Sequence, residues 1–417
     1  MALRFLHAAD LHLDTPFTAR GRYPEHVAAV LRDASLTAFG ALVEAALAHE
    51  VGFVVIAGDV YDGAERGVRA QLRFRDGLEQ LSDAGIRSFV AHGNHDPVDE
   101  GWSAIARFPE LVEVFPAGEV ASHAFEVAGQ AVTVHGISYG TAKVSENLSQ
   151  RFRAPTTPGL HVGVLHANVG SDPAHEAYSP CSVAELCAVG LDYWALGHIH
   201  ARRVLHRDPW IVYPGNLQGR SIRASEGGPK GALLVEAVDG RIGEPELLAL
   251  DVVRFATAEV DATGLDVDDL LGALLAAGDG ARAEAAGRSV LLGATVVGRG
   301  GLHERLRSTD LVAELLGELR DVAGETSPFL WWDDLSVATR PAVDLTARRG
   351  GDDFLADVLA TARELPTTTP DPRSGWTAGL APDIVRLAER DAPLPGVDEL
   401  WAEAAALAVD LLIGQEP

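Results

Sequence analysis

Five short apolar runs, each followed at once by polar residues, constrain the fold of this chain more than any other feature of its sequence. The runs cover residues 5–9, 53–57, 88–92, 161–165 and 193–196. Short runs rich in Val, Ile and aromatic residues and bounded by Gly or polar residues are typical of buried strands. Because α/β folds place their sites at the carboxyl ends of such strands, we expect the polar clusters to meet at one sheet edge. Gly58, Gly93 and Gly197 should let the backbone turn sharply there.

The polar clusters consist of residue types that bind metal ions. In chain order they are Asp10-Leu11-His12, Gly58-Asp59-Val60-Tyr61-Asp62, Gly93-Asn94-His95-Asp96, His166 and Gly197-His198-Ile199-His200. Their carboxylates, amide oxygen and imidazoles are enough for two metal ions, and two-metal sites serve phosphoryl chemistry. Oxygen mixed with imidazole, without thiolate, suits Mn, Fe or Zn. A single cluster is commonly a turn or a solvated strand end, so the prediction depends on all five occurring in this order.

The spacing within the clusters indicates which side chains share an ion. Residues i and i+2 of an extended segment point the same way, so Asp10 and His12 can bind one ion together. His198 and His200 can do the same or can divide between two ions, and the spacing leaves both arrangements open. Asp59 is the best candidate for a carboxylate that bridges both ions.

Together these motifs resemble those of the calcineurin-like metallophosphoesterases. Residues 5–14, 195–200 and 213–220 are similar to the SbcD-type DNA repair exonucleases, in particular their YhaO-like branch. The resemblance extends over residues 1–250 and, more loosely, over 251–365. It implies an α/β fold in which 1–250 form a four-layer αββα sandwich, 251–345 a smaller α+β capping domain, and 346–417 a helical C-terminal region.

The resemblance also implies a role for each site residue. One metal ion would be bound by Asp10, His12, Asp59 and His200. The second would be bound by Asp59, Asn94, His166 and His198. His95 would contact the scissile phosphate or protonate the leaving oxygen, and Asp96 would orient His95. All of these residue types are present.

The function implied is that of a DNA exonuclease or endonuclease. It would hydrolyse phosphodiester bonds by a two-metal-activated hydroxide, with Mn as the first expectation, in double-strand-break repair with an SbcC-like coiled-coil ATPase of the SMC type. A homodimer is expected by analogy alone. Two alternatives stay open: a metallophosphoesterase for another phosphodiester or a phosphomonoester, and a scaffold subunit that binds DNA ends. Gly63 and Asp96 stand where protein phosphatases tend to have Arg and Glu, which favours a diesterase.

The formal net charge of −26 is unusual for a DNA-binding protein. DNA binding would need a local basic face, since the overall field repels phosphate. Cationic side chains near the last cluster and in the following Gly-rich loop could contact backbone phosphates: Arg202, Arg203, Arg207, Arg220, Arg223 and Lys230. Of these, Arg220 and Arg223 are the predicted substrate-binding residues. The alternative, ordinary solvated surface charges, is equally well supported.

Further patterns bear on domains and compartment. Helical spacing predicts helices over 25–50 and 69–81, and residues 255–332 have the mixed pattern of a small α+β unit. Helical spacing also predicts a helix over 352–365 and a helical segment over 384–413, joined by a linker at 367–382; the last segment either docks on a partner or packs on its own chain. Cys181 and Cys187 match no zinc motif. Without a signal-peptide pattern or a long uncharged apolar stretch, we expect a cytoplasmic protein.

Overall fold

The fold was taken from a computed structural model of the chain. It describes residues 2–15, 23–63, 67–100, 103–170, 176, 178–223, 226–238 and 240–342, and six single positions beyond these. The helix predicted at 352–365, the linker at 367–382 and the helical segment at 384–413 fall, apart from those single positions, outside the described residues. Contacts divide the chain into two compact units, one comprising Met1–Ala258, Leu274–Ala294 and Leu316–Leu335 and the other comprising the rest.

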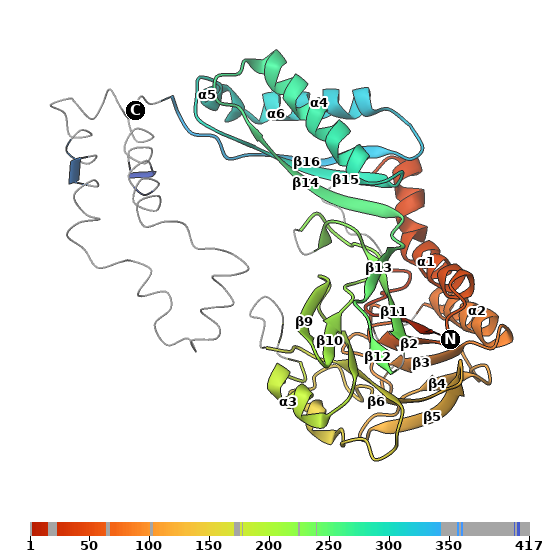
Figure 1. The fold of residues 1–417 in the computed structure, drawn as a ribbon. Helices are drawn as coiled ribbons and strands as arrows, with labels where there is room; N and C mark the ends of the chain where they lie inside the picture. The colour runs from red at the N-terminus through yellow and green to blue at the C-terminus, as the bar shows by residue number, and fades with distance from the viewer. Residues whose placement is uncertain are drawn as a thin grey trace. The chain divides into compact units, whose positions relative to one another are not determined.

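The first sheet contains the strands that lead into the first three polar clusters (Figure 1). Its order is β12-β11-β1-β2-β3-β4, with β13 also paired to β11. The bounds are β1 Leu3–Ala8, β2 Phe53–Ala57, β3 Arg87–Ala91, β4 Val112–Val114, β11 Gly231–Val238, β12 Arg241–Ile242 and β13 Glu246–Ala249. Strands β1 to β4 run parallel, whereas β11 is antiparallel to β1.

The second sheet contains the strands that lead into the last two clusters. Its order is β5-β6-β7-β8-β10-β9, with β6, β7, β8 and β10 parallel. The bounds are β5 Ala121–Val127, β6 Gln130–Gly136, β7 Leu160–His166, β8 Tyr193–Gly197, β9 Arg203–Arg207 and β10 Trp210–Tyr213. All five strands predicted before the clusters are therefore confirmed as strands, to within a few residues at their ends.

The two sheets pack face to face, and helices cover their outer faces. Side chains such as Phe53, Phe89, Val162 and Tyr193 form one buried core between the sheets. The opposite face of the first sheet packs on helices α1 (Glu25–Ala48) and α2 (Val68–Asp83). The outer face of the second sheet packs on α3 (Val183–Val189) and the 3₁₀ helix η1 (Leu148–Arg151). This is the predicted four-layer αββα sandwich.

Helix α1 is long and apolar enough to cross a membrane by length and composition alone, with a mean hydropathy of 1.3 over its most apolar window. Half of that window is buried. Residues Phe39, Leu42 and Val43 pack on Val54 and Ile56 of β2 within one cluster. A helix that buries one face on a sheet in this way is a core helix.

The remaining described elements form a smaller α+β region. Strands β14 (Val253–Asp261), β15 (Ser289–Val297) and β16 (Leu330–Val337) make a three-stranded sheet in that order. Helix α4 (Val267–Glu284) lies between β14 and β15 in the chain, and helices α5 (Leu302–Leu306) and α6 (Thr309–Ala323) lie between β15 and β16. Elements of this region contribute to both compact units.

Candidate metal centre

All five polar clusters begin where parallel strands end. The backbone of the first cluster is bonded to the second, since Asp10 N–H donates to the Gly58 carbonyl and His12 N–H to the Asp59 carbonyl, both at 3.0 Å. The Asp10 carboxylate also accepts the backbone N–H of His198 at 3.0 and 3.1 Å. These bonds join the exits of β1, β2 and β8, so residues from both sheets meet at one edge.

Glycines at the strand exits leave room for the functional side chains. Only Gly58 of the three predicted turn glycines has a positive φ, at 96°. A Cβ at Gly58 would collide with the His166 ring, one at Gly93 with the Asp59 carboxylate, and one at Gly197 with the Ala57 carbonyl. Gly93 and Gly197 are therefore required by the close approach of neighbouring atoms and not by the predicted sharp turn.

Several proposed ligands have backbone conformations that side chains other than glycine rarely adopt. The φ angles are 51° at Asp10, 43° at His12, 51° at Asp59 and 104° at His198. Such conformations cost roughly 1–3 kcal/mol each and persist where the surrounding structure imposes them, most often at functional sites.

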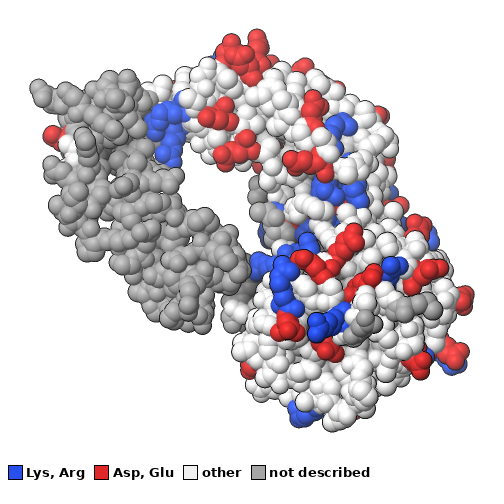
Figure 2. Space-filling model, in the orientation of Figure 1, with Lys and Arg blue, Asp and Glu red and all other residues white. Residues whose placement is uncertain are grey.

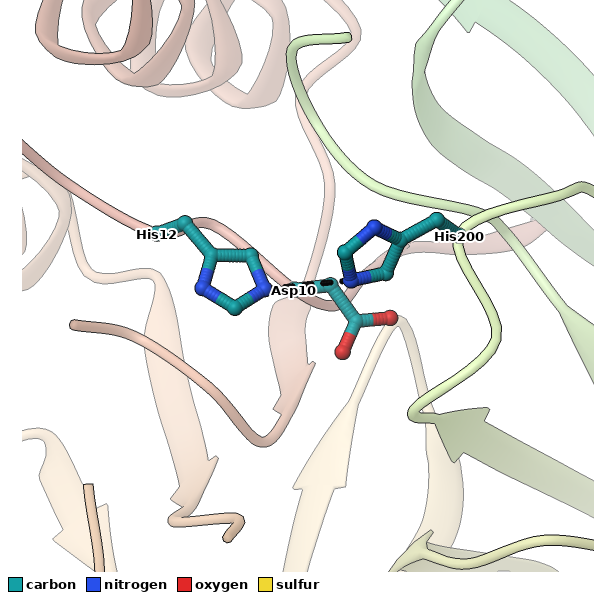
Figure 3. Close-up of side chains that lie close together, drawn as sticks. All are labelled: Asp10, His12 and His200. Atoms are coloured by element: carbon teal, nitrogen blue, oxygen red, sulfur yellow. Dashed lines mark hydrogen bonds between the residues drawn. The ribbon is translucent and has the colours of Figure 1, made fainter. Parts of the chain in front are cut away.

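Asp10, His12 and His200 form the first group of potential ligands (Figure 3). Their ligand atoms lie within 4.8 Å of one another. The Nε2 atoms of His12 and His200 face each other at 3.1 Å. The other ring nitrogens lie beside carboxylates: His12 Nδ1 is 3.1 Å from Asp62 Oδ1, and His200 Nδ1 is 2.6 Å from Glu226 Oε1. Because a carboxylate only accepts hydrogen bonds, the bond to Glu226 leaves the lone pair of a neutral His200 on Nε2.

Asp59, Asn94 and His166 form a second convergence. His166 Nδ1 donates to the Ala57 carbonyl at 2.9 Å, which leaves a lone pair on Nε2. That Nε2 atom lies 3.0 Å from Asn94 Oδ1 and 3.4 Å from Asp59 Oδ2. Asp59 Oδ2 is also 3.9 Å from His12 Nε2. Asp59 thus lies between the two groups, where a bridging carboxylate would be.

Among the described residues, His, Cys, Asp and Glu side chains form three groups of close ligand atoms, and His198 belongs to none of them. The groups are Asp10, His12 and His200; His12, Asp62 and His95; and Asp10, Asp59 and His166. The His198 Nε2 donates to the Glu176 carbonyl at 3.2 Å, which assigns the ring lone pair to Nδ1. Its ring centroid is 5.3 Å from that of His166. The His198 ring thus lies beside His166, whereas the His200 ring lies beside His12.

The donor set fits cations. Burial, with the neighbouring Asp59 charge next, raises the pKa of Asp10 well above its ordinary value, and burial also raises the pKa of Asp59. Burial lowers the pKa values of His12 and His166 to about 4, so both rings are neutral near pH 7. Buried carboxylates and lone pairs that face one another repel, and a divalent cation between them removes that cost.

The side chain beside His95 differs from the one predicted. His95 Nδ1 is 3.1 Å from Asp62 Oδ1. Asp96 instead accepts the backbone N–H groups of Val60 and Gly93 at 2.9 Å and lies 2.8 Å from His92 Nδ1. The prediction that Asp96 orients His95 is therefore wrong. The carboxylate beside His95 belongs to Asp62, and Asp96 instead holds the backbone of the loops that follow β2 and β3.

Asp62 connects several groups of the site. Burial would raise its pKa, but the His12 and His95 rings and then the Arg220 charge hold the pKa well below the usual range. The contact with Asp62 in turn raises the pKa of His95. The His95 side chain is 42% exposed, whereas that of His12 is 1% exposed. His95 is thus the imidazole of this group that a substrate can reach.

Three further residues contact His200 or its partner, although the sequence predicted no role for Glu226 or Asn216 and only a possible phosphate contact for Lys230. Glu226 contacts His200, Asn216 Nδ2 donates to Glu226 Oε2 at 2.6 Å, and Lys230 Nζ donates to the His200 carbonyl at 2.6 Å. Asn216 lies in the 213–220 segment and Lys230 in the Gly-rich loop, but nothing in their spacing indicates a contact with or near His200. Asp62 had a stronger signal, since it belongs to the second polar cluster.

The two predicted substrate-binding arginines differ in position. Arg220 Nη2 donates to Asp62 Oδ2 at 2.7 Å, so its guanidinium lies at the centre. The Arg223 side chain is exposed. Among the other cationic residues, Arg202 Nη2 donates to the Pro245 carbonyl at 3.2 Å and Arg207 pairs with Glu244 at 2.9 Å. Basic and acidic side chains alternate over the face seen in Figure 2, without a uniform basic surface.

Comparison with known proteins agrees with this geometry. The profile of the family described as calcineurin-like phosphoesterase matches residues 3–202. That of the family described as metallophosphoesterase YhaO, middle domain, matches residues 255–340. The chain is 37% identical over 263 residues to the uncharacterized metallophosphoesterase YhaO of Bacillus subtilis, covering 63% of this chain and 64% of that protein.

More distant relatives have names that refer to DNA or to a nuclease. The chain is 28% identical over 221 residues to the DNA double-strand break repair protein Mre11 of Thermoplasma acidophilum, covering 50% of this chain and 57% of that protein. It is 31% identical over 96 residues to a subunit of the nuclease SbcCD of Escherichia coli K12, covering 23% of this chain and 22% of that protein. The chain thus matches less than two thirds of the length of each relative. With the two profiles, these similarities show that the chain contains a calcineurin-like metallophosphoesterase domain, and they are consistent with the YhaO-like branch of the SbcD and Mre11 type.

Proposed function

We propose that the chain is a metal-dependent hydrolase of DNA phosphodiester bonds, an exonuclease or endonuclease of double-strand-break repair. The observation that carries the proposal is the convergence of lone-pair donors from both sheets, above all the facing Nε2 atoms of His12 and His200 at 3.1 Å. The relatives named as a DNA double-strand break repair protein and as part of a nuclease support DNA as the substrate.

The proposed ligands divide between two ions. One ion is assigned to Asp10, His12, Asp59 and His200, and the other to Asp59, Asn94, His166 and His198. The mixture of oxygen and imidazole donors favours Mn, with Fe or Zn as the alternatives. When bound, such a pair supplies Lewis-acid polarisation of a phosphoryl oxygen and a water of lowered pKa.

Residues of the chain itself complete the proposed chemistry. The exposed His95 protonates the leaving oxygen, which is a poor leaving group as an alkoxide. Asp62 holds the Nδ1 side of His95 and raises its pKa, which favours the protonated ring that a general acid needs. The His95 backbone N–H also donates to Asp59 Oδ1 at 3.0 Å, which ties the acid to the proposed bridging ligand. Arg220 supplies a positive charge for the phosphate.

Partners and compartment belong to the same proposal. The name of one relative describes it as one subunit of a nuclease, which supports a complex with a second protein; we propose that this protein is an SbcC-like coiled-coil ATPase. A homodimer and a cytoplasmic location are proposed with it. We also propose the division into a nuclease domain at 1–250, a capping domain at 251–345 and a helical C-terminal region at 346–417. Arg223 remains a proposed contact to DNA.

Hydrolysis assays on the purified chain test the proposal. The chain would be assayed with Mn²⁺ on double-stranded DNA, hairpin DNA, bis(p-nitrophenyl) phosphate and p-nitrophenyl phosphate, with and without the candidate ATPase. We expect cleavage of the DNA substrates and of the small diester, and little cleavage of the monoester. His123→Asn is a control, because His123 lies on β5 near Glu113 and outside the site.

Each of the other outcomes would contradict the proposal in a defined way. Hydrolysis of small diesters but of no DNA would instead indicate a phosphodiesterase that acts on another substrate. Metal binding without hydrolysis of any ester would instead indicate a scaffold subunit that binds DNA ends. Failure to take up any divalent ion would remove its basis altogether.

A further inference from the structure

The Glu226 carboxylate receives hydrogen bonds from three places at once. Its Oε1 lies 2.6 Å from His200 Nδ1, and its Oε2 accepts from Asn216 Nδ2 at 2.6 Å and from the Arg220 backbone N–H at 3.2 Å. Glu226 is 8% exposed and Asn216 is fully buried. Removing a buried carboxylate from such a network costs stability, because each donor that was bonded to it is left buried without a hydrogen-bond partner.

One consequence concerns the tautomer of His200. A carboxylate only accepts, so the contact with Glu226 places the proton of a neutral His200 on Nδ1. The lone pair is then on Nε2, the atom that faces His12 Nε2 at 3.1 Å. Lys230 Nζ holds the other side of the residue through the His200 carbonyl at 2.6 Å. The contacts therefore fix the ring's orientation and, for the neutral ring, its tautomer.

A second consequence concerns the loop that follows β10. Asn216 also donates to the Gln218 carbonyl at 2.9 Å, so its amide joins Glu226 to the backbone of that loop. Two residues further on is Arg220, whose guanidinium donates to Asp62 at 2.7 Å. One carboxylate thus connects His200 to the segment that presents Arg220.

We propose that Glu226 is a positioning residue that holds His200 in its metal-binding tautomer and couples metal binding to the order of residues 216–220. The inference depends on the proposed metal site and adds a residue that the sequence motifs do not contain. Carboxylates behind metal-bound histidines raise ligand basicity and fix ring orientation, and their loss typically lowers metal affinity about 10- to 100-fold. Here the same carboxylate also holds the loop.

Glu226→Gln tests this with little change in size. An amide offers one oxygen and one NH₂ where the carboxylate offers two acceptors. Either His200 Nδ1 or the pair Asn216 Nδ2 and Arg220 N–H must then face another donor. Glu244→Gln is the matched control, because Glu244 is 64% exposed and pairs with Arg207.

Calorimetric Mn²⁺ titration of the full-length chain is the first measurement. We expect Glu226→Gln to weaken Mn²⁺ binding by about 10- to 100-fold and Glu244→Gln to leave it unchanged. The second measurement is the tautomer of His200 from ¹⁵N-histidine spectra of the metal-free protein, with the signal assigned by His200→Asn. Wild-type His200 should be protonated on Nδ1, and the variant should lose this preference, which a purely structural role would not change.

Hydrogen exchange measures the proposed coupling. Mn²⁺ should slow amide exchange over residues 216–220 in the wild-type chain, and this protection should be lost in Glu226→Gln. Circular dichroism would verify folding. If Glu226→Gln does not fold, Glu226→Asp keeps both acceptors but withdraws them by one methylene, and should show a smaller loss in the same three measurements.

The outcomes separate this inference from the proposed function. If the wild-type chain takes up no divalent ion, the proposed metal site itself is wrong. If the wild-type chain binds Mn²⁺ and a folded Glu226 variant keeps its affinity, tautomer and loop protection, only the role of Glu226 is overturned.

Discussion

The Nε2 atoms of His12 and His200 lie 3.1 Å apart although 188 positions separate them in the chain. His12 follows β1 of the first sheet, and His200 follows β8 of the second. Their encounter therefore depends on the core that joins the two sheets, where Phe5, Phe53 and Tyr193 pack together. The proposed metal centre exists only when that interface is closed.

Asp59→Asn should reduce metal uptake. Asp59 Oδ2 lies 3.4 Å from His166 Nε2 and 3.9 Å from His12 Nε2, so its charge serves both proposed ions. We expect fewer than two Mn²⁺ ions per chain by elemental analysis after dialysis, and a loss of diester hydrolysis greater than the roughly 100-fold typical of outer carboxylates. The exposed Asp83→Asn on α2 is the control. Two ions bound at wild-type affinity would contradict the bridging role.

His95→Ala should keep its metal but lose turnover. Removal of a general acid typically costs about 10²- to 10⁴-fold, and Mn²⁺ content should not change because His95 is not a proposed ligand. The loss should be smaller with bis(p-nitrophenyl) phosphate than with DNA, since p-nitrophenolate needs less protonation to leave. DNA cleavage at nearly the wild-type rate would show that His95 is not the acid.

Arg220→Ala should weaken substrate binding more than it slows catalysis. Its guanidinium lies beside Asp62, where it can meet a phosphate. If it contacts one DNA phosphate, KM should rise and the slope of log affinity against log salt should become shallower by about 1. Arg87→Ala is the comparison, because Arg87 begins β3 and stacks on Phe125, away from the strand exits. Equal slopes for both variants would exclude the phosphate contact.

Gly197→Ala and Gly272→Ala should change stability in opposite directions. A Cβ at Gly197 would collide with the Ala57 carbonyl, whereas a Cβ at Gly272 in α4 meets no atom within 4 Å. Overpacking typically costs about 1–3 kcal/mol, and Gly to Ala inside a helix gains about 0.5–1 kcal/mol. Urea denaturation monitored by circular dichroism measures both. A neutral Gly197→Ala would mean that the sheets can separate locally at little cost.

The free energy of unfolding should decrease as the pH falls, in part because His135 becomes protonated. Burial, and then the neighbouring His161, lowers the pKa of His135 from 6.5 to about 4. Between these values the unfolded chain binds more protons than the folded one, so stability rises with pH. The contribution of His135 is complete above pH 6.5 and is lost as the pH falls toward 4. In a urea series from pH 7 to 4, His135→Gln should show a shallower decline in unfolding free energy than wild type, and parallel curves would contradict this assignment.

Many of the secondary-structure elements could be predicted from the local sequence. The apolar runs before Asp10, Asp59, Asn94, His166 and His198 are strands, and the helices predicted at 25–50 and 69–81 are α1 and α2. These elements could be predicted because period and composition over five to twenty residues reflect burial directly. The order of the clusters also pointed to one shared sheet edge, where the structure does bring them together.

Tertiary structure alone decided which side chains are partners. Asp96 adjoins His95 in the chain, yet its carboxylate binds backbone N–H groups near Val60 and Gly93, and Asp62 lies beside His95 instead. Glu226 contacts His200 although 26 positions separate them in the chain, and no sequence motif predicts this contact. The physical reason is that a buried carboxylate takes the donors that packing places within about 3 Å. That choice depends on how the two sheets and the loop after β10 come together, and not on neighbours along the chain.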